Sequence, residues 1–158
     1  MHDSLGYGLE NGKWVSPHYS WGVYLDDNTG GVDVVGNIVL RADRGLIHLH
    51  NGRDNLIQNN IFVGGKLQQA EFNGWTGKDS SWTSLLPTMM AGYNSVMKQP
   101  AWKTMRNMDV GPEQAVLPDG LTMSGNVFDR NIVYWTGESA KLFSGNKVPL
   151  NHNIWDHN

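Results

Sequence analysis

The segment that decides the fold is residues 21–63, WGVYLDDNTGGVDVVGNIVLRADRGLIHLHNGRDNLIQNNIFV. It contains one short pattern twice: an alternating strand, a turn rich in Gly, Asn and Asp, and a second short apolar strand. Asn37 is matched by Asn60 after 23 residues, and Tyr24 is matched by His48 after 24 residues. A repeat of this length, built from strands and tight turns, is typical of a coiled β solenoid.

The same phase continues into a third strand, because Glu71 follows His48 after 23 residues. Alternation predicts that three apolar pairs face the interior: Val23 with Leu25, Ile47 with Leu49, and Ala70 with Phe72. The other positions form two outward columns, Tyr24–His48–Glu71 and Asp26–His50–Asn73. Neighbouring strands lie about 4.8 Å apart. We therefore predict that these six side chains form a solvent-facing grid, which is the candidate functional site.

Stacked asparagines at the turns are a second sign of a solenoid. Asn37 and Asn60 occupy matching positions, and the pattern returns at Asn126, Asn131 and Asn153. Side-chain amides in such columns satisfy the backbone groups of the turns. We expect a structural role for these residues. Spacing does not decide whether Asn126 or Asn131 continues the column of Asn37 and Asn60.

The repeats divide the chain into four parts of a single domain, 1–158. These are an irregular lead-in at 1–20, regular coils at 21–74, a Trp-rich and partly helical insertion at about 75–119, and further coils at 120–158. The predicted fold is all-β, a parallel β-helix of about four to six coils. Neither end of the sequence has a polar capping unit. This favours a piece of a longer protein, with end-to-end homo-oligomerisation through the uncapped coils as the alternative.

Composition excludes several classes of function. The 158 residues carry a net charge of −3 and no cysteine, and their lysines and arginines are scattered. This disfavours binding to nucleic acid or to an anionic membrane surface. The absence of cysteine excludes thiolate metal sites. The sequence shows neither a membrane-spanning apolar run nor a signal peptide.

Three segments carry a resemblance to a known family: GVYLDD at 22–27, GRDNLIQNNIFV at 52–63 and NVFDRNIVYW at 126–135. They resemble bacterial right-handed parallel β-helix repeat proteins with the pectin-lyase-like fold, and the resemblance extends over nearly the whole chain. It implies a right-handed helix, a carbohydrate-active protein and a secreted or periplasmic location. Members include polysaccharide lyases, glycoside hydrolases and proteins without assigned activity. Their larger size implies that this chain is a C-terminal fragment lacking N-terminal coils.

Hydrolysis of a polysaccharide is the first functional hypothesis. The reaction needs two carboxyl groups, and Asp26 and Glu71 lie two strands apart on the predicted face. Side chains that lean toward each other across about 10 Å reach the roughly 6.5–9.5 Å of inverting enzymes. His48 and His50, between them, are predicted to orient the substrate or tune the carboxyl pKa values.

Substrate contacts are predicted around this pair. The residues are Tyr24, Asn73, Arg53, Asp54, Asp27 and Trp75. Asp27 and Asp54 replace the catalytic carboxylates if the register is one residue off. The alternative function is a carbohydrate-binding or structural solenoid without catalysis. The same surface fits it, because Tyr, His, Asn and Trp bind sugars by stacking and hydrogen bonding.

Elimination on a uronate is the third hypothesis. His48 or His50 would be the base, with Ca²⁺ held by Asp26, Asp27 and Asp54. The predicted face carries no Lys or Arg, and Arg53 lies in the adjoining turn, which disfavours this reaction. His48, His50 and Asp26 also have the spacing of a Zn²⁺ site. A substrate-binding role is favoured for them, so no metal or cofactor is predicted.

Overall fold

The computed structural model describes residues 1–107 and 110–158. Within them, twelve strands form three parallel sheets of four strands. Each sheet is named here after a central strand. The β6 sheet contains β1 (His2–Ser4), β6 (Ile38–Ala42), β9 (Ile61–Val63) and β12 (Ile132–Tyr134). The β7 sheet contains β4 (Trp21–Leu25), β7 (Gly45–His50), β10 (Gln68–Asn73) and β13 (Lys141–Asn146). The β8 sheet contains β5 (Asp33–Val35), β8 (Leu56–Gln58), β11 (Val127–Asp129) and β14 (Ile154–Asp156).

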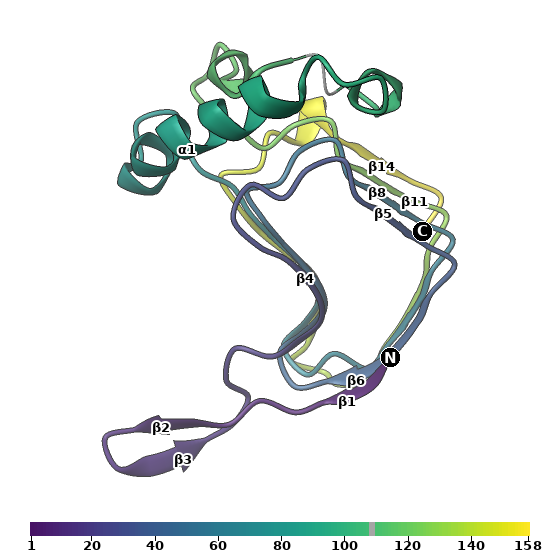
Figure 1. Cartoon of the computed structure of the whole chain (residues 1–158). Coiled ribbons are helices and arrows are strands. Elements are labelled where there is room, and N and C mark those ends of the chain that lie inside the picture. The colour runs from purple at the N-terminus through teal and green to yellow at the C-terminus, as the bar shows by residue number, and fades with distance from the viewer. Residues whose placement is uncertain (108–109) are drawn as a thin grey trace.

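Successive strands along the chain belong to successive sheets, so each circuit of three strands forms one coil (Figure 1). Four coils stack in this way, and the predicted parallel β-helix is confirmed. The predicted register is also confirmed, because Tyr24 pairs with His48 and His48 pairs with Glu71.

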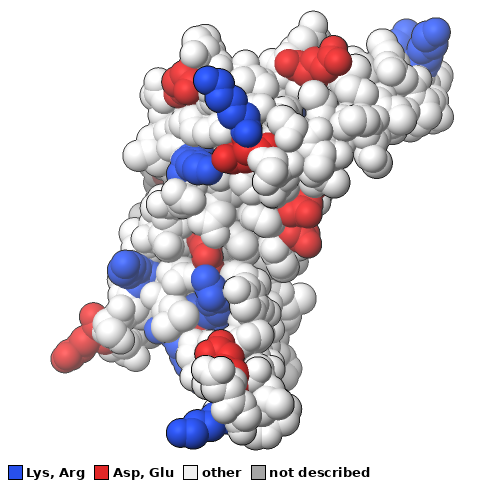
Figure 2. Space-filling view, turned by 90° about the vertical axis from the view of Figure 1, so that its left-hand side faces the viewer, with Lys and Arg blue, Asp and Glu red and all other residues white. Residues whose placement is uncertain are grey.

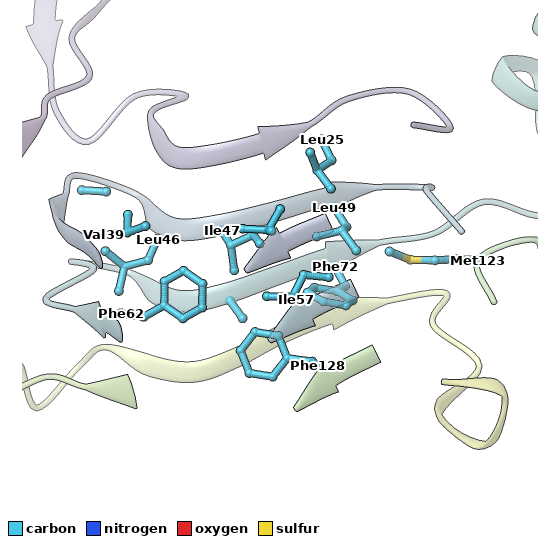
Figure 3. Packing of buried hydrophobic residues seen from close by; sticks show 13 residues of the cluster. Leu25, Val39, Leu46, Ile47, Leu49, Ile57, Phe62, Phe72, Met123 and Phe128 are labelled. Carbon is cyan, nitrogen blue, oxygen red and sulfur yellow. The ribbon is translucent and has the colours of Figure 1, made fainter. Parts of the chain in front are cut away.

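The interior is filled by apolar side chains from all three sheets (Figure 3). Leu46, Ile47, Leu49, Ile57 and Phe72 are fully buried there. Burial of each such side chain contributes roughly 1.5–3 kcal/mol.

Two asparagine ladders run along the stack. One contains Asn37, Asn60, Asn131 and Asn158, and the other contains Asn55, Asn126 and Asn153. Asn60 illustrates the pattern: its Nδ2 donates to Asn131 Oδ1 at 2.9 Å and to the carbonyl of Val34 at 2.8 Å. Asn131 therefore continues the column of Asn37 and Asn60, and Asn126 belongs to the other ladder.

Two segments project from the coils. Residues 1–20 are more regular than expected, since they contain β1 and an antiparallel hairpin of β2 (Gly8–Glu10) and β3 (Lys13–Val15). The insertion after β10 contains α1 (Ser80–Val96) and the short helices η1 (Trp102–Thr104) and η2 (Pro112–Ala115); its residues 108 and 109 lie outside the described residues. Figure 1 shows the hairpin and α1 near opposite ends of the strands of the β7 sheet, both on its outer side.

A further short helix, η3 (Leu150–His152), precedes β14. None of the helices in the described part of the chain combines the length and apolar character needed to cross a bilayer.

Candidate functional site

The strands of the β7 sheet do not alternate strictly. Leu46 and Ile47 are consecutive, yet both are fully buried in the core (Figure 3). In β4 a Cβ atom at Gly22 would collide with the side chain of the core residue Val39, so this position also faces inward. Strict alternation from an inward Val23 would place Trp21 in the interior. Because Gly22 also faces inward, the strand changes phase there and Trp21 lies on the outer face.

This change of phase adds residues that the sequence pattern missed. The Trp21 ring lies 4.4 Å from the His48 ring and 4.8 Å from the Tyr24 ring, measured between centroids. Arg44, directly before β7, lies over the same surface, with its guanidinium carbon 5.0 Å from the Trp21 ring and 5.5 Å from the Tyr19 ring. The expectation that the face carries no Lys or Arg is therefore wrong.

The first predicted column, Tyr24–His48–Glu71, lies in register but is largely covered. Tyr24 is 43% exposed and stacks on His48, with centroids 4.7 Å apart and an interplanar angle of 6°. His48 and Glu71 are buried. The prediction that these two side chains face solvent is wrong, because Trp21, Tyr24 and Arg44 lie over them.

Glu71 is held by donors on both carboxylate oxygens. Oε2 accepts from Trp21 Nε1 at 2.8 Å, from Arg44 Nε at 3.1 Å and from Gln68 Nε2. Oε1 accepts from Arg44 Nη2 at 3.3 Å and Asn73 Nδ2 at 3.0 Å. Burial opposes ionisation of Glu71, but the hydrogen bonds from Arg44 and Trp21 outweigh it and hold its pKa below the ordinary value. The site therefore stabilises a carboxylate rather than a proton donor.

His48 is neutral near pH 7. Burial lowers its pKa to about 4. Asn73 Nδ2 lies 3.3 Å from His48 Nε2, which accepts this hydrogen bond because the amide nitrogen is a donor. The Nδ1 atom of His48 is buried and has no partner among the described residues. The imidazole thus fills the space between the aromatic rings and the Glu71 network.

The second column ends in an exposed acidic cluster. His50 Nδ1 lies 3.1 Å from Asp26 Oδ1 and 2.8 Å from Asp27 Oδ1. The Tyr24 hydroxyl, followed by His50, lowers the pKa of Asp26. Ligand atoms of Asp26, Asp27 and His50 lie within 4.8 Å of one another, a spacing compatible with a divalent cation. The zinc site considered from the sequence consisted of Asp26, His48 and His50. In the structure Asp27, and not His48, lies with Asp26 and His50.

A cavity of about 460 Å³ adjoins this cluster on the side of α1. Most of its lining is polar: His50, Asn73, Gly74, Trp75, Asp79, Ser80, Ser81, Asn146 and Lys147. Trp75 is mostly buried and meets the His50 ring edge-on at 5.2 Å. The predicted residues His50, Asn73 and Trp75 are thus brought together at one end of the face.

Arg53 and Asp54 do not join the face. Arg53 Nη1 donates to Asp54 Oδ2 at 2.9 Å, and its Nη2 donates to the carbonyl of Val110. Asp54 Oδ1 accepts from Asn107 Nδ2 at 3.0 Å. These contacts hold the insertion against the coils. Arg53 also borders a mainly apolar cavity of about 300 Å³ under α1, whose walls include Trp82, Met89 and Val96.

The fold and this face define a parallel β-helix with an aromatic and polar outer surface. No protein-family model, no curated protein and no solved structure matches the chain.

Proposed function

We propose that this chain binds a polysaccharide or oligosaccharide across the outer face of the β7 sheet. The observation that carries the proposal is the continuous row of rings from Tyr19 through Trp21 and Tyr24 to His48, exposed at its two tyrosines. Flat rings stack on the C–H faces of sugars, and their hydroxyl groups bond to sugar hydroxyls. The polar cavity beside His50 and Asn73 continues this row with hydrogen-bonding groups.

The shape of the molecule suits an extended ligand. The hairpin and α1 flank the β7 sheet on its outer side (Figure 1). Figure 2 views the molecule from this side and shows charged groups of both signs separated by broad uncharged areas. The resemblance of three segments to bacterial pectin-lyase-like β-helix proteins also favours carbohydrate as the ligand. Membership in that family and a secreted or periplasmic location are part of the same proposal.

Hydrolysis of the bound chain by Asp26 and Glu71 is a second candidate function. It is favoured by the exposed Asp26 carboxylate beside His50, because an ionised carboxylate in reach of solvent can accept a proton from water. The hydrogen bonds of Glu71 disfavour the proton-donor role that hydrolysis also requires. Release of reducing ends that is lost in Asp26→Asn, with binding intact, would support hydrolysis.

The binding proposal is tested by calorimetric titration of the chain with a panel of plant, algal and bacterial oligosaccharides. At least one is expected to bind, and Tyr24→Ala should weaken its binding about 5- to 10-fold, which corresponds to the loss of one aromatic contact. Tyr134→Ala is the matched control, because Tyr134 is an exposed tyrosine on the β6 sheet. Binding that is equal in wild type and Tyr24→Ala, or no binding throughout the panel, would overturn the proposal.

A further inference from the structure

We infer that the glycan bound on this face lacks uronic acids, and that amino sugars bind there more tightly than their neutral analogues. The inference rests on the proposed carbohydrate-binding function and concerns its selectivity. It follows from which charges on the face are already paired and which are open to a ligand.

The cationic groups of the face are engaged. Arg44 makes two hydrogen bonds to Glu71, so its charge is balanced by a buried carboxylate. In the lining of the polar cavity, Lys147 Nζ pairs with Asp79 Oδ2 at 2.8 Å. A uronate that binds on the face would have to compete with Glu71 for Arg44 or with Asp79 for Lys147. The protein carboxylate that it displaced would then lose its cationic partner.

The exposed acids are not balanced in the same way. The side chains of Asp26 and Asp27 are 61% and 51% exposed. Within the described residues, His50 is the one basic side chain within ion-pair distance of either. The surface that a ligand meets next to Tyr24 is therefore acidic. It repels a sugar carboxylate and attracts a sugar ammonium group.

The surroundings of the acids indicate a sugar amine rather than an isolated cation. The Tyr24 hydroxyl lies 3.4 Å from His50 Nδ1, so the exposed ring adjoins the acidic cluster. His50 also lines the polar cavity, together with Asn73 and Trp75. A sugar stacked on Tyr24 would thus place its substituents beside Asp26 and Asp27. Amine, hydroxyl and amide groups are the substituents that these side chains recognise.

The test uses three matched tetrasaccharides on the backbone that binds in the oligosaccharide panel. On a β-1,4-glucose backbone these are cellotetraose, the glucosamine tetramer and the C6-oxidised glucuronate tetramer; a galactose backbone has the corresponding set. Titrations are run at about pH 6, low salt and excess chelator, so that amines are protonated and divalent cations are removed. The amino tetramer is expected to bind at least 3-fold more tightly than the neutral one, and the uronate at least 10-fold more weakly.

The double variant Asp26→Asn, Asp27→Asn should bring the three affinities within about 3-fold of one another. Glu138→Gln, an exposed acid elsewhere on the chain, should preserve the wild-type order. Equal or tighter uronate binding would overturn the inference. So would uronate binding that appears on adding Ca²⁺ in place of the chelator, since this would mean that the acidic cluster holds a cation. If no glycan binds, the proposed function itself fails.

Discussion

The guanidinium of Arg44 donates two hydrogen bonds to the carboxylate of Glu71, Nε to Oε2 at 3.1 Å and Nη2 to Oε1 at 3.3 Å. The Glu71 side chain is 5% exposed and that of Arg44 is 30% exposed. The pair joins β10 to the segment before β7, and Trp21, whose ring lies against the guanidinium of Arg44, also donates to Glu71. This contact makes Glu71 the anchor of the outer face of the β7 sheet.

Replacing Glu71 by Gln should destabilise the fold by about 2–3 kcal/mol, because Arg44 loses its counter-charge while the site stays polar. The estimate lies below the range for fully buried pairs because Arg44 is partly solvated. Urea unfolding followed by tryptophan fluorescence measures the change. The control is Asp3→Asn, which breaks the exposed bidentate pair with Arg41 and should change stability much less. Similar losses in both variants would contradict an anchoring role for Glu71.

The buried His48 predicts a pH dependence of stability. Its pKa is about 4 in the folded state and 6.5 ordinarily, so the unfolded chain binds more protons between these values. Stability should therefore fall as the pH is lowered from about 6.5 to about 4, by at most about 3 kcal/mol. Glu71 and Asp26, whose pKa values lie below their ordinary 4.5 and 3.8, add a further loss that begins near these values and continues at lower pH.

Replacing His48 by Phe keeps a ring between Trp21 and Tyr24 but removes the titration. The variant should have a flatter stability profile between pH 6.5 and pH 4, measured by urea unfolding at half-unit steps. His152→Gln, at an exposed position, should keep the wild-type profile. An unchanged slope in His48→Phe would show that other groups govern acid sensitivity.

The asparagine ladder predicts a large effect at Asn60. Asn60→Ala removes two donated hydrogen bonds and leaves the backbone N–H of Asn37, now 2.9 Å from Asn60 Oδ1, without its acceptor. A loss of about 3 kcal/mol is expected. Asn94→Ala, on the exposed side of α1, should be neutral or slightly stabilising because alanine favours a helix. A loss below about 1 kcal/mol for Asn60→Ala would argue that water replaces the ladder.

Much of this architecture is predictable from the sequence because each coil repeats the same constraints. The matched positions of Tyr24, His48 and Glu71 predicted the pairing of three strands, and the matched Asn37 and Asn60 predicted one asparagine ladder. The second ladder, through Asn55, was not predicted. The predicted features depend on local spacing. A period of two fixes which side chains share a face, and a repeat of about 23 residues fixes which strands are neighbours.

The content of the face was harder to predict because it depends on a change of phase within the strands. The consecutive inward residues Leu46 and Ile47 bring Trp21 and Arg44 to the outer side, where they cover His48 and Glu71. The available signals were Gly22 beside Trp21 in the first repeat and the apolar pair Leu46-Ile47 in the second. Whether an outward side chain is exposed depends on neighbours from other coils, which a pattern along one strand does not contain.

The most direct test of the central claim is to map a bound oligosaccharide by NMR, following backbone amides and the indole N–H groups of tryptophan. A glycan chosen from the oligosaccharide panel should shift signals of β4, β7 and β10, including the indole N–H of Trp21, while signals of the β6 and β8 sheets stay unchanged. Shifts confined to those two sheets, or to the apolar cavity under α1, would contradict binding on the outer face of the β7 sheet.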